Sequence, residues 1–335
     1  MSDHPAAAPV PPPTGEQAPG GRRDPQRPAL HREFLERALV TGQERSWRAL
    51  EIVARTGSTN ADLAVRARAG EGEGLVLVAD HQSAGRGRLT RSWQTPPRSS
   101  LAVSVLLRPR VDQRYWSWLP LLAGLAVAET LRGTCGLWAG VKWPNDVLVR
   151  ARGRTGGTDR GDGQDPVHPA EPVRPLEPVK VCGILAEMVL PASPGPAGPA
   201  VVLGAGLNVS QRPEELPVAT AGSLVTAGAQ VTDRDVVLRD CLRALAVRYT
   251  AWQDRGGDPR ASGLEEDLVR SCVTLGRRVV VHLEGGVPLS GTADGIDGQG
   301  RLLVTDDAGR RHVLAAGDVV HVRGRRAPGG VPGLV

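Results

Sequence analysis

Five short apolar segments limit the folds that are open to this chain of 335 residues. They are rich in leucine and β-branched residues, end at glycine, proline or polar residues, and cover residues 75–80, 101–107, 147–149, 181–190 and 201–209. Segments of this length and composition are typical of buried strands. An apolar run over residues 119–132 predicts a buried helix. An amphipathic repeat over residues 232–252 predicts a second helix, with Thr232 or Asp233 as its N-cap. Because strands outnumber helices and mix with them, we predict an α+β (α/β) domain over residues 45–262.

The remaining segments differ in composition. Residues 272–323 alternate short apolar runs with Gly- and Asp-rich turns, a pattern that predicts a small all-β barrel. Residues 1–28 and 152–178 are rich in proline, glycine and charge, and they hold too little apolar surface to offset the entropy of ordering. We interpret them as a disordered tail and a flexible insertion. The segment HREFLERALV, at residues 31–40, predicts the start of folded structure.

Composition argues against several classes of protein. No apolar run approaches the ~18 residues that a membrane span needs, and no signal-peptide pattern is present, so we expect a cytoplasmic protein without membrane association. The four cysteines are far apart and form no Cys-x-x-Cys pair, which argues against a zinc site and against a disulfide framework. The net charge of +5 could indicate nucleic-acid binding, but acidic residues lie between the arginines throughout.

The segment DHQSAGRGRLTRSW, at residues 80–93, combines arginine with glycine. Glycine lets the backbone approach a ligand closely, and arginine offers paired donors that match phosphate or carboxylate oxygens. The segment is neither a Walker loop nor a Gly-x-Gly-x-x-Gly motif. Taken alone it could be a solvated turn, but its composition suits an anionic ligand and a loop that closes over it.

Four other short motifs carry polar residues at the ends of predicted elements. They are TGSTNADL (56–63), VKWPND (141–146), KVCGILAE (180–187) and GAGLNV (204–209). Thr59 and Asp62 have the spacing of a capping box at a helix start. Each motif alone is compatible with an ordinary turn, cap or strand end. The only two lysines in the chain, Lys142 and Lys180, lie in these motifs, which indicates that a compact ammonium group matters there.

Together, and in this order, the five motifs resemble those of the biotin–protein ligases, in the form that lacks an N-terminal DNA-binding domain. The resemblance runs from about residue 53 to residue 322 and is interrupted by the 152–178 insertion. It implies a catalytic domain like that of class II aminoacyl-tRNA synthetases, followed by an SH3-like barrel. It also implies two reactions: ATP and biotin form biotinyl-5′-AMP, and a lysine of a biotin carboxyl carrier domain then receives the biotin.

The same resemblance implies the site residues. Those implied for biotin are Ser58, Thr59, Asn60, Gln82, Gly85, Arg86, Gly87, Arg88, Lys180 and Gly183. Those implied for the nucleotide are Arg88, Arg91, Trp93, Lys142, Asn145, Asp146, Lys180 and Asn208. Lys180, Arg88 and Arg86 would be catalytic, and Asp146 would face Mg²⁺. Thr90 stands where the family usually has glycine, so the loop geometry near Arg91 is less well defined.

The implied partner is a carrier domain of acetyl-CoA, propionyl-CoA or pyruvate carboxylase, and a homodimer is possible. We expect no DNA binding and no repressor activity, because the residues before Glu51 offer at most one short helix. Three alternatives stay open: a lipoate–protein ligase or octanoyltransferase, a basic nucleic-acid-binding module, and a carrier-domain binding protein without activity. The arginine-glycine loop and the C-terminal barrel favour the biotin ligase.

Overall fold

The computed structural model describes residues 26–43, 46–88, 91–151, 177–193, 198–283 and 286–321. The expected disordered tail lies outside the described residues up to residue 25, and the expected insertion does so up to residue 176. Thr90 also lies outside them, so its effect on the loop stays a prediction.

A seven-stranded sheet forms the centre of the main body, in the order β1-β2-β3-β7-β6-β5-β4. Its strands are β1 Ala49–Val53, β2 Leu75–Ala79, β3 Ser100–Leu107, β4 Ala139–Lys142, β5 Asp146–Val149, β6 Val179–Val189 and β7 Ala200–Asn208. The β1–β2 pair is parallel and the other pairs are antiparallel, so the sheet is mixed. All five apolar segments predicted as strands are confirmed.

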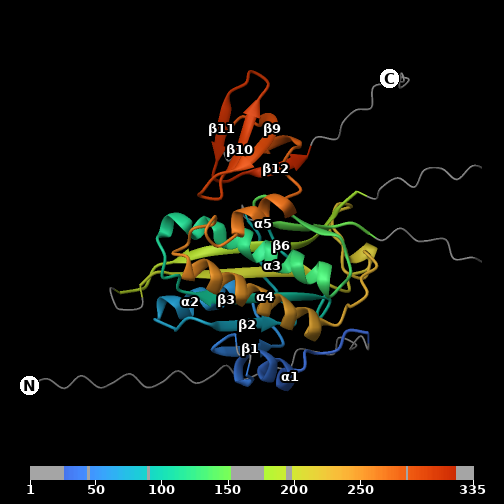
Figure 1. Ribbon diagram of the computed structural model, residues 1–335. Coiled ribbons are helices and arrows are strands. Elements are labelled where there is room, and N and C mark those ends of the chain that lie inside the picture. Colours follow the sequence, from blue (N-terminus) through green and yellow to red (C-terminus); the bar gives the residue numbers. More distant parts are fainter. Residues whose placement is uncertain are drawn as a thin grey trace, which may run out of the picture.

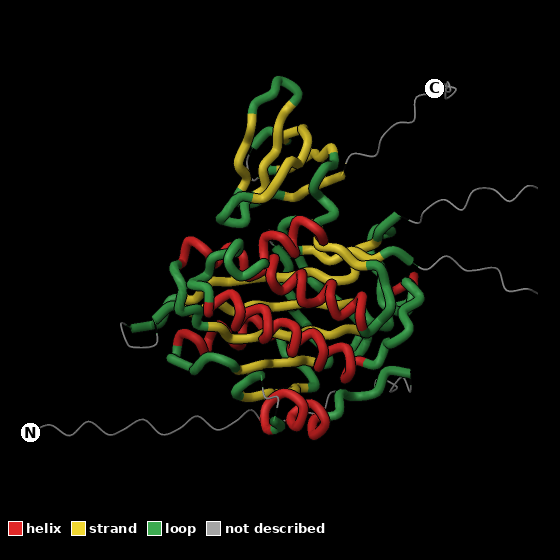
Figure 2. The backbone as a smooth tube through the Cα atoms, in the orientation of Figure 1, coloured by secondary structure: helices red, strands yellow, loops and turns green. Residues whose placement is uncertain are grey.

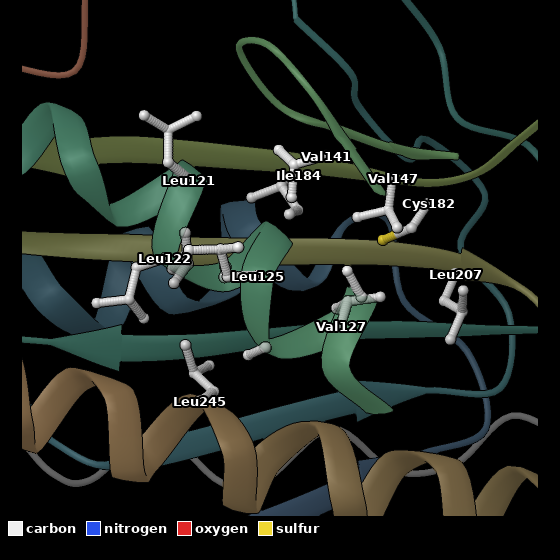
Figure 3. Packing of buried hydrophobic residues seen from close by; sticks show 14 of the residues in the cluster. Leu121, Leu122, Leu125, Val127, Val141, Val147, Cys182, Ile184, Leu207 and Leu245 are labelled. Atoms are coloured by element: carbon white, nitrogen blue, oxygen red, sulfur yellow. The ribbon is translucent and has the colours of Figure 1, made fainter. Parts of the chain in front are cut away.

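Two long helices cover one face of this sheet, α3 (Leu119–Gly133) and α4 (Arg234–Asp254) (Figures 1 and 2). Figure 3 shows side chains of α3, such as Leu122 and Leu125, gathered with Ile184 of β6 and Leu245 of α4. Helix α3 is buried on almost every side, as its apolar run predicts. The N-cap of α4 is Asp233, one of the two expected N-caps, whose carboxylate accepts from backbone N–H groups of the first turn.

Helix α2 (Thr59–Arg68) packs on the opposite face of the sheet. Because side chains alternate along a strand, Val76 of β2 belongs to the α3–α4 core, whereas Leu77 packs with Leu63 of α2. The N-cap of α2 is Ser58, whose hydroxyl accepts from the Ala61 N–H. The expected Thr59–Asp62 capping box is therefore wrong by one residue, and the Asp62 carboxylate accepts from the Thr56 hydroxyl instead.

The described chain before β1 contains α1 (Arg32–Glu36) and the π-helical turn η1 (Arg37–Thr41). Leu35 and Leu39 are fully buried in the main core, so folded structure begins where the sequence predicts it. Two short 3-10 helices, η2 (Gln113–Trp118) and η3 (Pro213–Glu215), lie within the loops that precede α3 and α4.

A second, antiparallel sheet follows α5 (Leu264–Ser271) and confirms the expected small all-β unit. In the order β11-β10-β9-β8-β12, its strands are β11 Arg311–Leu314, β10 Leu302–Asp306, β9 Leu289–Ile296, β8 Arg278–His282 and β12 Asp318–His321. It sits beyond the β4 edge of the main sheet (Figure 1). The buried Trp143 joins the two sheets, because its indole N–H donates to the Gly300 carbonyl at 3.0 Å.

A buried ion pair holds the end of β2. Asp80 accepts from Arg98 Nε at 3.0 Å and from Arg234 Nη2 at 2.8 Å, and the side chains of Asp80 and Arg234 are only 8% and 7% exposed. Removing one member of a buried pair leaves a charge without compensation, which costs about 3–5 kcal/mol. We expect Asp80→Asn to lower the free energy of unfolding in urea by about 3 kcal/mol.

The matched control is Asp307→Asn, which breaks the exposed pair with Arg278. Exposed pairs contribute about 0–1 kcal/mol, so this variant should unfold almost like the wild type. Equal losses for the two variants would contradict a structural role for the buried pair.

Candidate active site

A cavity of about 1360 Å³ opens on the face of the main sheet that also carries α2. The N-terminus of α2, the arginine-glycine loop, strands β3, β5, β6 and β7, and the C-terminal sheet all contribute to its walls. All of the sequence-predicted site residues except Gly85 line it: Ser58, Thr59, Asn60, Gln82, Arg86, Gly87, Arg88, Arg91, Trp93, Lys142, Asn145, Asp146, Lys180, Gly183 and Asn208. The structure thus brings together motifs that are far apart in the sequence.

Strand β7 gives this cavity an axis. Gly204, Gly206 and Asn208 alternate along the strand and face the cavity, about 6–7 Å apart at each step. The neighbouring strand β6 runs antiparallel, with Leu185 opposite Gly204 and Gly183 opposite Gly206. We call the three positions along β7 the α2 end, the middle and the lysine end of the cavity.

The α2 end is a buried, polar cluster. The Ser104 hydroxyl hydrogen-bonds to the Thr59 hydroxyl (2.7 Å) and to Asn60 Oδ1 (2.6 Å). The Thr59 N–H and hydroxyl donate to Gln82 Oε1 at 2.8 and 3.0 Å, and the Asn60 amide donates to Glu187 Oε2 at 2.8 Å. Thr59, Asn60 and Ser104 are at most 5% exposed. The Glu187 carboxylate is paired with Arg86, so the cluster carries no net charge, and its fixed donors and acceptors suit a neutral polar ring on a ligand.

Ser104 and Glu187 were not among the predicted site residues. Ser104 is the only polar residue within the apolar strand LAVSVLL, and a buried hydroxyl in a strand needs a partner. That rule could have identified it from the sequence. Glu187 ends the KVCGILAE motif, but the sequence gives no sign that its carboxylate would bridge Asn60 and Arg86.

The indole of Trp93 fills the middle of the cavity against two glycines. A Cβ at Gly206 would lie 2.5 Å from Trp93 Cε2, and one at Gly183 would lie 3.2 Å from Trp93 Cζ3. Any larger residue would therefore displace the ring. Gly85 has a different role: its carbonyl accepts from the Trp93 N–H at 2.8 Å, and a Cβ there would meet the Trp93 carbonyl oxygen at 2.3 Å. It shapes the loop from outside the cavity.

Lys180 reaches from the lysine end back towards the middle. Its Nζ lies 2.6 Å from Asp146 Oδ1 and 5.7 Å from the centre of the Trp93 ring. Burial lowers the pKa of the neighbouring Lys142, and the charge of Asp146 partly opposes this shift. Burial likewise lowers the pKa of the Arg88 guanidinium, which donates to Asn145 Oδ1 at 3.3 Å.

The other loop arginines also have partners. Arg86 pairs with Glu187 at 3.3 Å, and Arg91 pairs with Asp318 at the start of β12. Six cationic residues line the cavity against three acidic ones, Asp146, Glu177 and Asp318. The excess of positive charge suits an anionic ligand. Each loop arginine could release its present protein partner and bond to the ligand instead.

A loop closes the lysine end. The Lys180 N–H donates to the Thr220 carbonyl and the Gly222 N–H donates to the Lys180 carbonyl, both at 2.8 Å. The Asn208 amide donates to the Gly222 carbonyl and accepts from Gln211, so this predicted nucleotide ligand already has protein partners. Residues 217–221 form the wall, and nothing in their composition indicated this.

The C-terminal sheet also contributes residues that the sequence analysis missed, namely Arg277, Asp318 and His321. They are more than 90 positions from Lys180 in the sequence, and no local pattern marks them. In the part of the chain that the structure describes, no group of three or more His, Cys, Asp or Glu residues could hold a metal ion. The cysteines are free thiols, and burial raises the pKa of Cys182.

His321 offers a pH-dependent test of the C-terminal rim. Burial lowers its pKa to about 4, and Lys142 and Arg277 act in the same direction. The unfolded value is about 6.5, so the unfolded chain binds the extra proton between these values and stability falls as the pH drops through this window. We expect His321→Gln to reduce the pH dependence of the urea midpoint between about pH 7 and about pH 4.5. An unchanged pH dependence would contradict a partly buried, neutral imidazole in the folded protein.

Comparison with known proteins gives consistent results. The model of the Biotin/lipoate A/B protein ligase family matches residues 53–190, and that of the Biotin protein ligase C terminal domain matches residues 274–322. A biotin--[acetyl-CoA-carboxylase] ligase of Mycobacterium tuberculosis is 41% identical over 307 residues, which cover 90% of this chain and 99% of that protein. A ligase of the same name from Paracoccus denitrificans is 29% identical over 79% of this chain and 98% of its own length.

Among solved structures, the chain is similar to the biotin protein ligase from Aquifex aeolicus in complex with biotin and ATP. The TM-score is 0.60 at 25% sequence identity, and the match covers 83% of this chain and all of that chain. No helix in the described ranges is long and apolar enough to cross a membrane.

Proposed function

The chain belongs to the biotin/lipoate A/B protein ligase family, and we propose that its cavity binds biotin at the α2 end and ATP at the lysine end. The protein is a biotin protein ligase. It activates biotin with ATP as biotinyl-5′-AMP and transfers the biotinyl group to a carboxylase carrier protein. The observation that carries the assignment of the cavity is the meeting of five separate motifs around it, with a neutral polar cluster at one end and cations at the other.

The two ends of the cavity suit the two substrates. The ring system of biotin is polar but uncharged, which matches the buried hydroxyl and amide groups of Thr59, Asn60 and Ser104. The biotin carboxylate would then point along β7 towards Lys180. ATP brings the larger negative charge, which matches the excess of cations around the middle and the lysine end.

In the first reaction a carboxylate oxygen of biotin bonds to the α-phosphorus of ATP while the bond from that phosphorus to pyrophosphate breaks. Two anions must approach each other, so fixed positive charge at their meeting point lowers the barrier. We assign this role to Lys180, Arg88 and Arg86. Arg86 would give up its bond to Glu187, and Arg88 its bond to Asn145, and each would bond to substrate oxygens instead.

In the second reaction the amine of the acceptor lysine attacks the biotinyl carbonyl carbon and AMP leaves with the electrons of the broken anhydride bond. The amine loses a proton, for which Asp146 is the candidate acceptor beside Lys180. We propose the carrier domain of an acetyl-CoA carboxylase as the acceptor, by analogy with the relative from Mycobacterium tuberculosis. We assign catalysis to residues 45–262 and the rim of the site to residues 272–323.

We propose that Mg²⁺ enters with the nucleotide. Asp146 is a carboxylate already paired with Lys180, and among the residues that the structure describes no group of three or more metal-binding side chains forms a complete cage around it. That donor set fits Mg²⁺, which usually keeps several waters and binds through one or two carboxylates plus substrate phosphates. When bound, the ion would neutralise phosphate charge beside the cations of the cavity.

Pyrophosphate release with three different acids tests the substrate. The purified protein is given ATP and Mg²⁺ with biotin, lipoate or octanoate, first without an acceptor and then with a carrier domain. Of the three acids, we expect only biotin to cause release of pyrophosphate. With the carrier domain present, we expect the carrier domain to become biotinylated. A carrier variant whose acceptor lysine is replaced with arginine should stay unmodified. Release with lipoate or octanoate but not biotin would keep the fold and overturn the substrate.

A further inference from the structure

The segment that precedes α1 is tied to the loop that closes the lysine end of the cavity. Arg27 is only 7% exposed, and its guanidinium makes a two-pronged pair with Glu215 of η3, at 3.1 and 2.5 Å. The same guanidinium donates to the Ser210 carbonyl at 2.9 Å. Arg27 therefore joins two points of the loop that follows β7, although 183 positions separate it from the nearer one.

Glu215 is itself fixed from several sides. Its carboxylate also accepts from the Arg212 N–H at 2.8 Å, and the Arg27 guanidinium is the main cause that holds the pKa of Glu215 below its usual range. The carboxylate is thus charged at neutral pH. A partly buried, charge-assisted pair of this geometry fixes direction as well as position.

Two residues after Glu215, the chain enters the wall of the cavity. Pro217, Val218, Thr220 and Ala221 line it, and the backbone of residues 220–222 hydrogen-bonds to both sides of Lys180. A displacement of η3 would therefore move the wall beside Lys180. It would leave the cluster of Thr59 and Ser104 untouched, because that cluster lies four residues away along β7, or about 13 Å.

The segment has a second anchor that holds Arg27 in place. The carbonyl of the next residue, Pro28, accepts from Arg234 Nη2 at 2.8 Å, and Arg234 belongs to the buried pair with Asp80. The His31 N–H donates to the Asp235 carboxylate at 2.8 Å. The segment that carries Arg27 is thus hydrogen-bonded to the start of α4, and the Arg27 side chain reaches from there to the loop.

We propose that Arg27 is a positioning residue for ATP: through Glu215 it holds residues 217–221 in the place where they form the nucleotide side of the cavity. Arg27 does not touch a substrate. The inference rests on the proposed function, because it takes the lysine end of the cavity as the nucleotide end.

Separate Michaelis constants for ATP and biotin test the proposal. We would measure them by biotin-dependent exchange of pyrophosphate into ATP, using the full chain and the Arg27→Ala variant. We expect the KM for ATP to rise about tenfold, within the range of coupling through a packed loop, and the KM for biotin to change less than about twofold. Arg27→Lys keeps the charge but loses the two-pronged geometry, so its KM for ATP should be intermediate.

A double-mutant cycle and a matched control make the test specific. If Arg27 acts through Glu215, the double variant Arg27→Ala/Glu215→Gln should have a KM for ATP no higher than that of the single variant with the larger effect. Arg66→Ala removes a similar two-pronged pair, which Arg66 makes with Glu51. Its N···O distances are 2.6 and 2.8 Å. That pair lies away from the cavity, so both Michaelis constants should stay at the wild-type values.

The outcomes separate the inference from the function on which it rests. A wild-type protein without exchange activity would overturn the proposed function. An active wild type with unchanged constants for Arg27→Ala would overturn the positioning role alone. Equal rises in both Michaelis constants would show that Arg27 affects the whole cavity rather than its nucleotide side, and would overturn the positioning role. Additive effects in the cycle would show that Arg27 and Glu215 act independently, and would also overturn it.

Discussion

Replacement of Lys180 with alanine is expected to slow the formation of biotinyl-5′-AMP by about 100-fold to 1000-fold, the usual cost of removing one well-placed charged donor. The ammonium group of Lys180 lies near the middle of the cavity, 2.6 Å from Asp146 and over the ring of Trp93. Without it, the carboxylate of Asp146 would lose its ion-pair partner and repel the two substrate anions more strongly. The rate in a single turnover, with biotin and ATP saturating, measures the effect.

Two further variants serve as comparisons for Lys180→Ala. Lys180→Arg keeps the charge, but its planar, wider head spreads that charge and does not reproduce the compact ammonium group that lies 2.6 Å from Asp146 Oδ1. We therefore expect it to recover only part of the rate. Arg278→Ala removes an exposed cation from the C-terminal sheet and should react like the wild type. A Lys180→Ala variant that is less than about tenfold slower would remove Lys180 from the chemistry.

Replacement of Gly204 with alanine is expected to weaken biotin binding by about 10-fold to 100-fold, which corresponds to the 1–3 kcal/mol that overpacking usually costs. A Cβ at Gly204 would lie 2.0 Å from Asn60 Oδ1. Asn60 is buried and bonded to Ser104 and Glu187, so it cannot move without breaking the α2 end of the cavity. Titration calorimetry with biotin measures the loss.

Gly133→Ala is the matched control, because nothing lies within 4 Å of a Cβ at that position. Its biotin affinity should equal that of the wild type. Since a strained Gly204→Ala variant could also be less stable, its thermal midpoint is measured first, and binding is compared below the unfolding transition. Unchanged biotin affinity in a folded Gly204→Ala variant would place biotin elsewhere in the cavity.

The sequence predicted the fold where local pattern and burial coincide. The strand segments are continuous apolar runs because most of these strands are buried on both faces, and α4 shows a clear apolar stripe because one side faces solvent. The start of α2 was placed one residue late. Ser58 and Thr59 are adjacent and both have cap-forming hydroxyls, and only the backbone geometry distinguishes them.

The candidate site was predicted as far as its short motifs extend. The motif residues around Lys180 and Asn60 line one cavity, but their roles stay predictions. Contributions from long range had no local signal: Asp318 meets Arg91 across the two sheets, and Arg27 meets Glu215 across 188 positions. Such pairs depend on how the elements pack, which periodicity and composition do not encode.

A crystal structure of the full chain with biotinyl-5′-AMP tests the central claim most directly, because the adenylate contains both halves of the predicted ligand. We expect its biotin rings within hydrogen-bond distance of Asn60 or Ser104, its phosphate beside Lys180, and its adenine against residues 217–221. A ligand bound in the reverse direction, or outside this cavity, would contradict the account.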